Sequence, residues 1–77
     1  DVEIQCGSIH LSSGWNTIEF PEKFSGIPIV VCTTLVEDFI ITLSSISETS
    51  FQAYLFLPGD SMNSVSGSIN YIATFKE

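Results

Sequence analysis

The sequence contains no arginine, and its only lysines are Lys23 and Lys76, so basic side chains are scarce. The chain of 77 residues has nine acidic residues against these two lysines, and its formal net charge is −7. A nucleic-acid-binding protein presents clustered basic residues to the phosphates, and two separated lysines do not form such a cluster. We therefore expect no nucleic-acid partner.

Histidine and cysteine, which supply many metal and nucleophile sites, are also rare. His10 is the only histidine, and Cys6 and Cys32 are the only cysteines. These three residues do not form a zinc motif, and no nucleophile-elbow motif selects a serine that His10 could activate. We expect no metal, no cofactor and no enzymatic activity. The two cysteines either pack as free thiols within strands or form one disulfide, and both readings stay open.

Long hydrophobic runs are absent as well, since none approaches the roughly 20 residues that a membrane-spanning helix needs. We therefore expect no membrane insertion. The start at Asp1 lacks a basic segment followed by an apolar one, so no signal peptide is recognised, and no Asn-x-Ser/Thr sequon occurs. We expect residues 1–77 to be a single domain that forms the C-terminal part of a longer chain.

Residues that favour helices are few: alanine occurs twice and methionine once, and no segment has a sustained apolar period of 3.6. β-branched and aromatic residues dominate, and turn-forming groups such as residues 12–14 and 58–61 interrupt them at short intervals. This pattern predicts an all-β sandwich or barrel. The expected strands are residues 2–11, 15–20, 28–36, 39–46, 50–57 and 67–75.

Several of these strands are apolar on both faces. In the third, Ile29, Val31 and Leu35 alternate with Val30 and Cys32. A small sandwich has one interior and cannot cover both faces, while large exposed apolar surfaces usually mark interfaces. We therefore expect an obligate homo-oligomer. The alternative is that these side chains are exposed singly, which is normal for a protein surface.

Ligand binding is a more plausible activity than catalysis. The aromatic-rich strand that contains Tyr54 and Phe56 leads into a polar loop, in which hydrogen-bonding side chains could bind sugar hydroxyls while a ring supports the apolar face of the sugar. The alternative is ordinary turn chemistry. Trp15 is expected to be an anchor in the core or in an interface, because tryptophan buries a large area. The candidate ligand-binding residues are Tyr54, Phe56, Asp60, Ser61 and Asn63, with Glu37 and Asp38 as a secondary loop.

The adjacent carboxylates of Glu37 and Asp38 also raise the question of a cation site. They lack the pattern of a 12-residue calcium loop, so we interpret them as part of a solvated acidic rim.

A series of short motifs extends over nearly the whole chain and resembles the H-type lectin domain and the related C-terminal domains of bacteriophage tail fibres. The motifs are Gly14-Trp15, Ile18-Glu19-Phe20-Pro21, Phe24, Pro28-Ile29-Val30-Val31, Ile46-Ser47, Thr49, Phe51-Gln52-Ala53 and Ile69-Asn70-Tyr71-Ile72-Ala73. The resemblance implies an H-type lectin-like, six-stranded antiparallel β-sandwich that assembles as a homotrimer.

The chain departs from the lectins at the sugar site. Thr42 stands at the position that matches their sugar-binding arginine, and their Trp-His pair is replaced at about Pro58-Gly59. Thr49-Ser50-Phe51 lacks the family's turn glycine, and Tyr71 replaces its closing tryptophan. The resemblance therefore implies the scaffold but not the amino-sugar site.

These observations lead to the hypothesis of a non-catalytic receptor-binding domain at the tip of a phage tail fibre or a similar appendage. It would recognise a cell-surface carbohydrate as a homotrimer, on the virion or in another extracellular setting. The lack of arginine favours neutral or cationic glycans over strongly anionic ones. A purely structural trimerisation or capping domain and a secreted defence lectin are the alternatives.

Overall fold

The computed structural model of the chain describes residues 1–35, 38–59 and 65–77. Within these residues the chain forms six β-strands and no helix, as the sequence predicted. No described segment could therefore cross a membrane as an apolar helix. Each strand lies within or close to its expected range. The strands are β1 (Val2–Leu11), β2 (Trp15–Glu19), β3 (Ile29–Thr34), β4 (Ile40–Ser44), β5 (Ser50–Phe56) and β6 (Gly67–Lys76).

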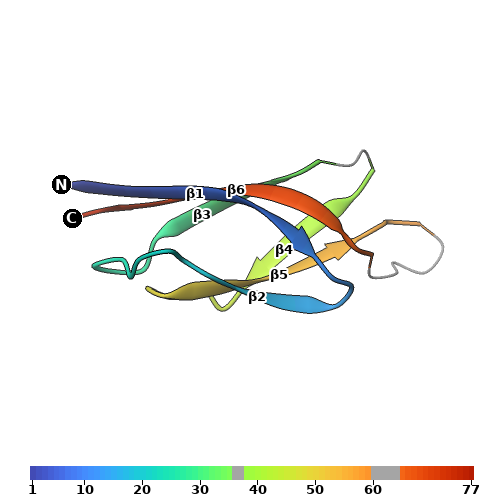
Figure 1. The fold of residues 1–77 in the computed structure, drawn as a ribbon, viewed down its shortest axis with the longest axis horizontal. Helices are drawn as coiled ribbons and strands as arrows, with labels where there is room; N and C mark the ends of the chain where they lie inside the picture. The colour runs from blue at the N-terminus through green and yellow to red at the C-terminus, as the bar shows by residue number, and fades with distance from the viewer. Residues whose placement is uncertain (36–37, 60–64) are drawn as a thin grey trace.

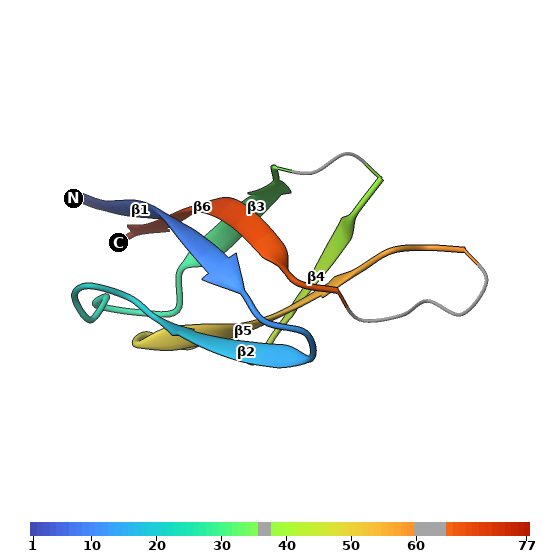
Figure 2. The same cartoon turned by 45° about the vertical axis from the view of Figure 1, so that its right-hand side comes forward.

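The strands form two antiparallel three-stranded sheets, which lie one above the other in Figure 1. Sheet A has the order β1-β6-β3, and sheet B has the order β2-β5-β4. Among the described residues, β4 and β5 are the one pair of strands that are consecutive in the chain and also paired in a sheet. Every other connection passes from one sheet to the other. The rotated view in Figure 2 shows the crossings from β1 to β2 and from β2 to β3 at opposite ends of the sandwich. The antiparallel β-sandwich predicted from the sequence is therefore confirmed.

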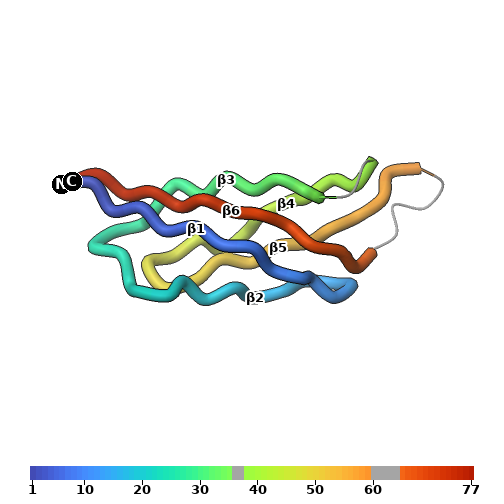
Figure 3. The backbone as a smooth tube through the Cα atoms, turned by 45° about the horizontal axis from the view of Figure 1, so that its top comes forward, coloured from blue at the N-terminus to red at the C-terminus, as the bar shows by residue number. Residues whose placement is uncertain are grey.

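The first and last strands pair along their whole length. Their register runs from Val2 opposite Lys76 to Leu11 opposite Gly67, and the two termini lie side by side at one end of the molecule (Figure 3). The chain measures 44 Å along its longest axis but only 19 and 16 Å across. Each sheet therefore has a long outer face relative to the narrow interior.

The core consists of alternate residues from both sheets, because successive side chains of a strand point to opposite faces. Phe51, Ala53 and Leu55 of β5 are fully buried, as are Ile69 and Ala73 of β6. In both strands the buried residues are alternate ones, so one face of each strand is turned inward. The other buried apolar residues are Leu11, Ile18, Phe20, Phe24, Val30 and Tyr71.

The connection between β2 and β3 closes the end of the sandwich near the termini. Phe24 in this connection is buried, and its ring meets that of Phe20 edge to face, with centroids 4.9 Å apart. The Gln5 side chain binds the connection from β1. Its Nε2 donates to the Glu22 carbonyl oxygen at 2.8 Å, and its Oε1 accepts from the Glu22 amide at 3.1 Å.

The two cysteines are free. Cys6 lies opposite Ile72, on the outer face of sheet A, whereas Cys32 lies opposite Tyr71, whose side chain is buried in the core. Strand β6 separates β1 from β3, and the two thiols point to opposite sides of the sheet. Of the two readings that the sequence left open, the structure therefore has free thiols: Cys32 packs partly against the core, whereas Cys6 is exposed rather than packed.

Candidate functional site

The outer face of sheet B carries a group of neighbouring aromatic side chains. Tyr54 in the central strand β5 lies opposite Trp15 of β2 on one side and opposite Thr42 of β4 on the other. Phe56 is two residues further along β5 and points to the same face. We call Trp15, Thr42, Tyr54 and Phe56 the aromatic depression, because together they line a shallow, open hollow of about 440 Å³.

The three rings are close but not parallel. The centroids of Trp15 and Tyr54 lie 5.3 Å apart with an interplanar angle of 57°, and those of Tyr54 and Phe56 lie 6.2 Å apart at 52°. Trp15 exposes 53% of its surface, while Tyr54 and Phe56 are half-buried. The depression is thus a tilted series of rings on which an apolar ligand face can lie.

The turn between β1 and β2 positions Trp15. Gly14, immediately before it, has a φ of 92°, a left-handed conformation that glycine adopts without the steric cost of a Cβ. The Asn16 amide donates to the carbonyl oxygens of Ser12 and Gly14 at 2.8 and 3.1 Å, and its Oδ1 accepts from the Ser12 amide at 3.1 Å. Asn16 therefore stabilises the turn from the inner side of the strand, while its neighbour Trp15 points outward.

Polar side chains lie beside the aromatic depression. The next outward-facing row of sheet B consists of Thr17, Gln52 and Ser44, which are paired across the three strands. Within the depression, the hydroxyls of Thr42 and Tyr54 can donate and accept hydrogen bonds. One face of sheet B thus offers rings for apolar contact and hydroxyl and amide groups for hydrogen bonding, without a cationic side chain.

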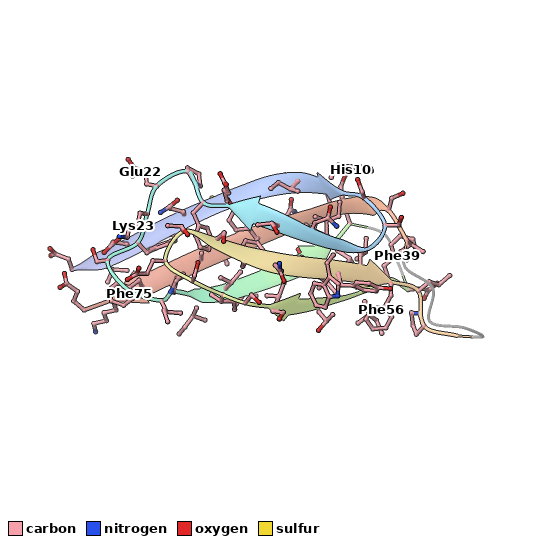
Figure 4. The ribbon with its side chains drawn as sticks, turned by 90° about the horizontal axis from the view of Figure 1, so that it is seen from below. His10, Glu22, Lys23, Phe39, Phe56 and Phe75 are labelled. Carbon is pink, nitrogen blue, oxygen red and sulfur yellow. The ribbon has the colours of Figure 1, made fainter. Side chains whose placement is uncertain are left out.

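The structure brings together two of the residues that the sequence singled out. Tyr54 and Phe56 both line the depression, and Figure 4 labels Phe56 close to the end of β5. Asp38 is exposed just before β4, with a φ of 70°, and does not line the hollow. Glu37, Asp60, Ser61 and Asn63 lie outside the described residues.

Sequence reasoning missed Trp15 and Thr42 as parts of this site. Of the two places expected for Trp15, the core is wrong, because its ring lies on the outer face of sheet B, while an interface stays a prediction. The signal was available in the alternation of β2. Since Ile18 and Phe20 are buried, the residues of odd number in this strand face outward, and Trp15 is one of them.

The single histidine lies away from the depression. His10 is exposed on β1, opposite Ser68 of sheet A (Figure 4). In the described part of the chain, no three His, Cys, Asp or Glu side chains form a group that could hold a metal ion. The residues of the aromatic depression instead provide a surface for non-covalent contact.

Comparison of the chain with family models, with curated proteins and with solved structures finds no match. The function is therefore inferred from the geometry of the site and the motifs of the sequence.

Proposed function

We propose that this chain is a non-catalytic carbohydrate-binding domain that recognises a cell-surface glycan through the aromatic depression. The observation that carries this proposal is the exposed series of Trp15, Tyr54 and Phe56 around Thr42. One face of a pyranose ring presents C–H groups, which pack against the negative face of an aromatic ring. The sugar hydroxyls at its edge then require hydrogen-bonding partners, which Thr42 and the adjacent polar row supply.

Charge narrows the class of glycan. The chain has a net charge of −7 and no arginine, so no guanidinium is present to pair with a carboxylate or phosphate. The lysines do not line the depression. Neutral or cationic surface polymers are therefore the favoured ligands, because an anionic polymer would be repelled by the acidic surface.

The resemblance to H-type lectins and phage fibre domains supports a more specific setting. In this setting the chain forms a homotrimer at the tip of a tail fibre or a similar extracellular appendage. Thr42, at the position that matches the sugar-binding arginine of the lectins, lines the depression. An open hollow of this kind provides little burial for a ligand, and repetition of weak sites in an oligomer would raise the avidity.

A glycan array of neutral, cationic and anionic bacterial surface polysaccharides tests the proposal. We expect binding to neutral or cationic polymers. Trp15→Ala and Tyr54→Ala should each weaken it by about fivefold or more, since removal of one stacking ring costs on the order of 1–3 kcal/mol. Tyr54→Phe keeps the ring and should retain most of the affinity. Thr33→Ala, on the outer face of sheet A, is the matched control and should bind like the native chain.

Two outcomes would contradict parts of this proposal. Binding that survives both alanine variants would move the site away from the depression. In that case, loss of binding in Asp60→Ala would assign the site to the loop after β5. A folded, assembled chain that binds no glycan would favour the purely structural role in a fibre.

A further inference from the structure

The outer face of sheet A has an apolar half near the chain termini. Across the sheet, Ile4 and Ile29 both lie opposite Thr74, and Cys6 and Val31 both lie opposite Ile72. The aliphatic members expose between 43% and 71% of their surfaces. The residues of this apolar patch are Val2, Ile4, Cys6, Ile29, Val31 and Ile72.

The patch ends at a row of polar side chains. Ser8, Asn70 and Thr33 pair across the three strands in the next outward-facing row, and Ser8 Oγ donates to Asn70 Oδ1 at 2.5 Å. Within the patch there is no charged side chain. Its members are β-branched aliphatic residues and one cysteine, and the Thr74 hydroxyl lies among them on the same face. With a single hydroxyl, such a surface offers little to orient a sugar, but it fits another flat aliphatic face.

The size of the patch is suited to a protein interface. Its aliphatic side chains expose on the order of 500 Å², which is as large as the largest apolar patch of a typical monomer. Ile27, two residues before Ile29, is also 66% exposed. A standard interface takes roughly 800 Å² from each partner, so the patch would form the apolar centre of such an interface.

Charge points to a second copy as the occupant. Each copy carries a charge of −7, so two copies can associate only where carboxylates are kept apart. The patch meets this condition because none of its side chains is acidic, and the one charged residue that pairs with it is Lys76, opposite Val2. Burial of uncharged aliphatic surface then stabilises the contact without a cost for charge desolvation.

We propose that the apolar patch of sheet A is a self-association surface, which packs against the same sheet of other copies of this chain around a shared symmetry axis. This inference names the surface behind the oligomer of the proposed function and does not depend on the sugar site. The aromatic depression lies on the opposite outer face of the sandwich, in sheet B, and stays open when the patch is covered. Association would therefore present several depressions outward.

The two cysteines provide a footprint of the interface. Cys6 lies within the patch, whereas Cys32 lies on the inner face of the same sheet as an internal control. We expect the reaction of Cys6 with a soluble maleimide to be slow in concentrated protein and about tenfold or more faster after dilution, because dilution dissociates the copies. Cys32 should react slowly at every concentration. A Cys6 rate that is fast at every concentration would overturn the proposal.

Sedimentation analysis of matched variants provides a second test. Ile29→Lys places a charge at the most exposed position of the patch and should give a folded monomer. Thr33→Lys places the same charge on the same strand and face, outside the patch, and should retain the assembly. If Ile29→Lys does not fold, Ile4→Lys on β1 takes its place. A native chain that sediments as a monomer, or a folded patch variant that stays assembled, would contradict the inference.

A binding measurement separates this inference from the sugar site. The monomeric patch variant should bind a single glycan unit with the native affinity per site and should lose only the avidity for a multivalent surface. Failure of glycan binding in an assembled native chain would contradict the proposed function but not the self-association surface.

Discussion

Two weakly acidic side chains lie opposite each other on the inner face of sheet A. Cys32 of β3 pairs with Tyr71 of β6, and a Cβ at Gly7 of β1 would lie 3.0 Å from the Tyr71 ring. Desolvation by burial raises the pKa of the Cys32 thiol from its ordinary 9.0 to about 11. Burial likewise raises the pKa of Tyr71 above its ordinary 10.0, with smaller contributions from the two cysteines.

This environment predicts a loss of stability at alkaline pH. Above about pH 9 the unfolded chain releases the Cys32 proton while the folded chain retains it, so the free energy of unfolding should fall as the pH rises toward 11. Urea unfolding at about pH 8 and pH 10.5 measures the fall. Cys32→Ala should reduce this fall, with Tyr71 supplying the remainder. Cys6→Ala should reduce it only slightly, because Cys6 makes a smaller contribution to the raised pKa of Tyr71. An equal fall in native and Cys32→Ala protein would exclude this cause.

At the scale of elements, the connection from β2 to β3 is held by two side chains of β1. Gln5 makes two hydrogen bonds to the Glu22 backbone, and Glu3 Oε1 accepts from the Ser25 amide at 3.2 Å. Nearby, the Phe75 ring occupies the space beside Gly26, where a Cβ would lie only 2.4 Å from Phe75 Cε1. This connection, which carries the chain from sheet B to sheet A, is therefore fitted closely against β1 and β6.

Loss of the Gln5 contacts should loosen this connection. Gln5→Met keeps the length of the side chain but removes both hydrogen bonds, and we expect a destabilisation of about 1–2 kcal/mol. Gln52→Met makes the same chemical change on the outer face of sheet B and should alter stability by less than about 0.5 kcal/mol. Urea unfolding of the two variants measures the difference. If the two variants have equal free energies of unfolding, the hydrogen bonds of Gln5 contribute no more to stability than hydrogen bonds to water would.

Gly26 gives an independent test of the same connection. Gly26→Ala should destabilise the fold by about 1–3 kcal/mol, because the added methyl group requires the Phe75 ring to move. In a Phe75→Leu background the cost should be smaller, because the ring edge is absent. A thermodynamic cycle of the four proteins measures the coupling. Additive effects of the two substitutions would exclude the steric contact as the cause.

At the scale of the whole molecule, the two outer faces have different chemistry. Sheet B presents rings beside hydroxyl and amide groups, and sheet A presents an aliphatic surface that ends in a polar row. The two faces lie on opposite sides of one thin sandwich. One face can therefore serve association while the other stays accessible to a ligand.

The acidic charge of the whole molecule predicts how salt affects binding. A neutral glycan chosen from the array should bind with an affinity that changes less than about twofold between 20 and 300 mM salt. A carboxylated form of the same glycan should bind more weakly at low salt and regain affinity as salt screens the repulsion. Titration at the two salt concentrations checks this. Tighter binding of the carboxylated form at low salt would indicate a basic site and contradict the proposed ligand class.

The strand ranges and the inward faces could be predicted because they depend on local alternation. The set of Phe51, Ala53 and Leu55 was recognisable from the sequence, since residues of the same parity in a strand share a face. The two-sided apolar strands also indicated surface in excess of the core, and Ile29 and Val31 are indeed exposed. By contrast, the grouping of Trp15 with Thr42 and Tyr54 could not be read from spacing, because it depends on which strands pair and in which register.

The sequence alone determined the all-β class, the approximate strands and the acidic character, because alternation, turn residues and charge are properties of short segments. It also placed Tyr54 and Phe56 on one face of their strand. Only the tertiary structure decided that Trp15 lies outside the core, that the cysteines point to opposite faces and that the aromatic and aliphatic surfaces belong to different sheets. These features depend on contacts between residues far apart in the chain, such as Val2 with Lys76, which no local pattern encodes.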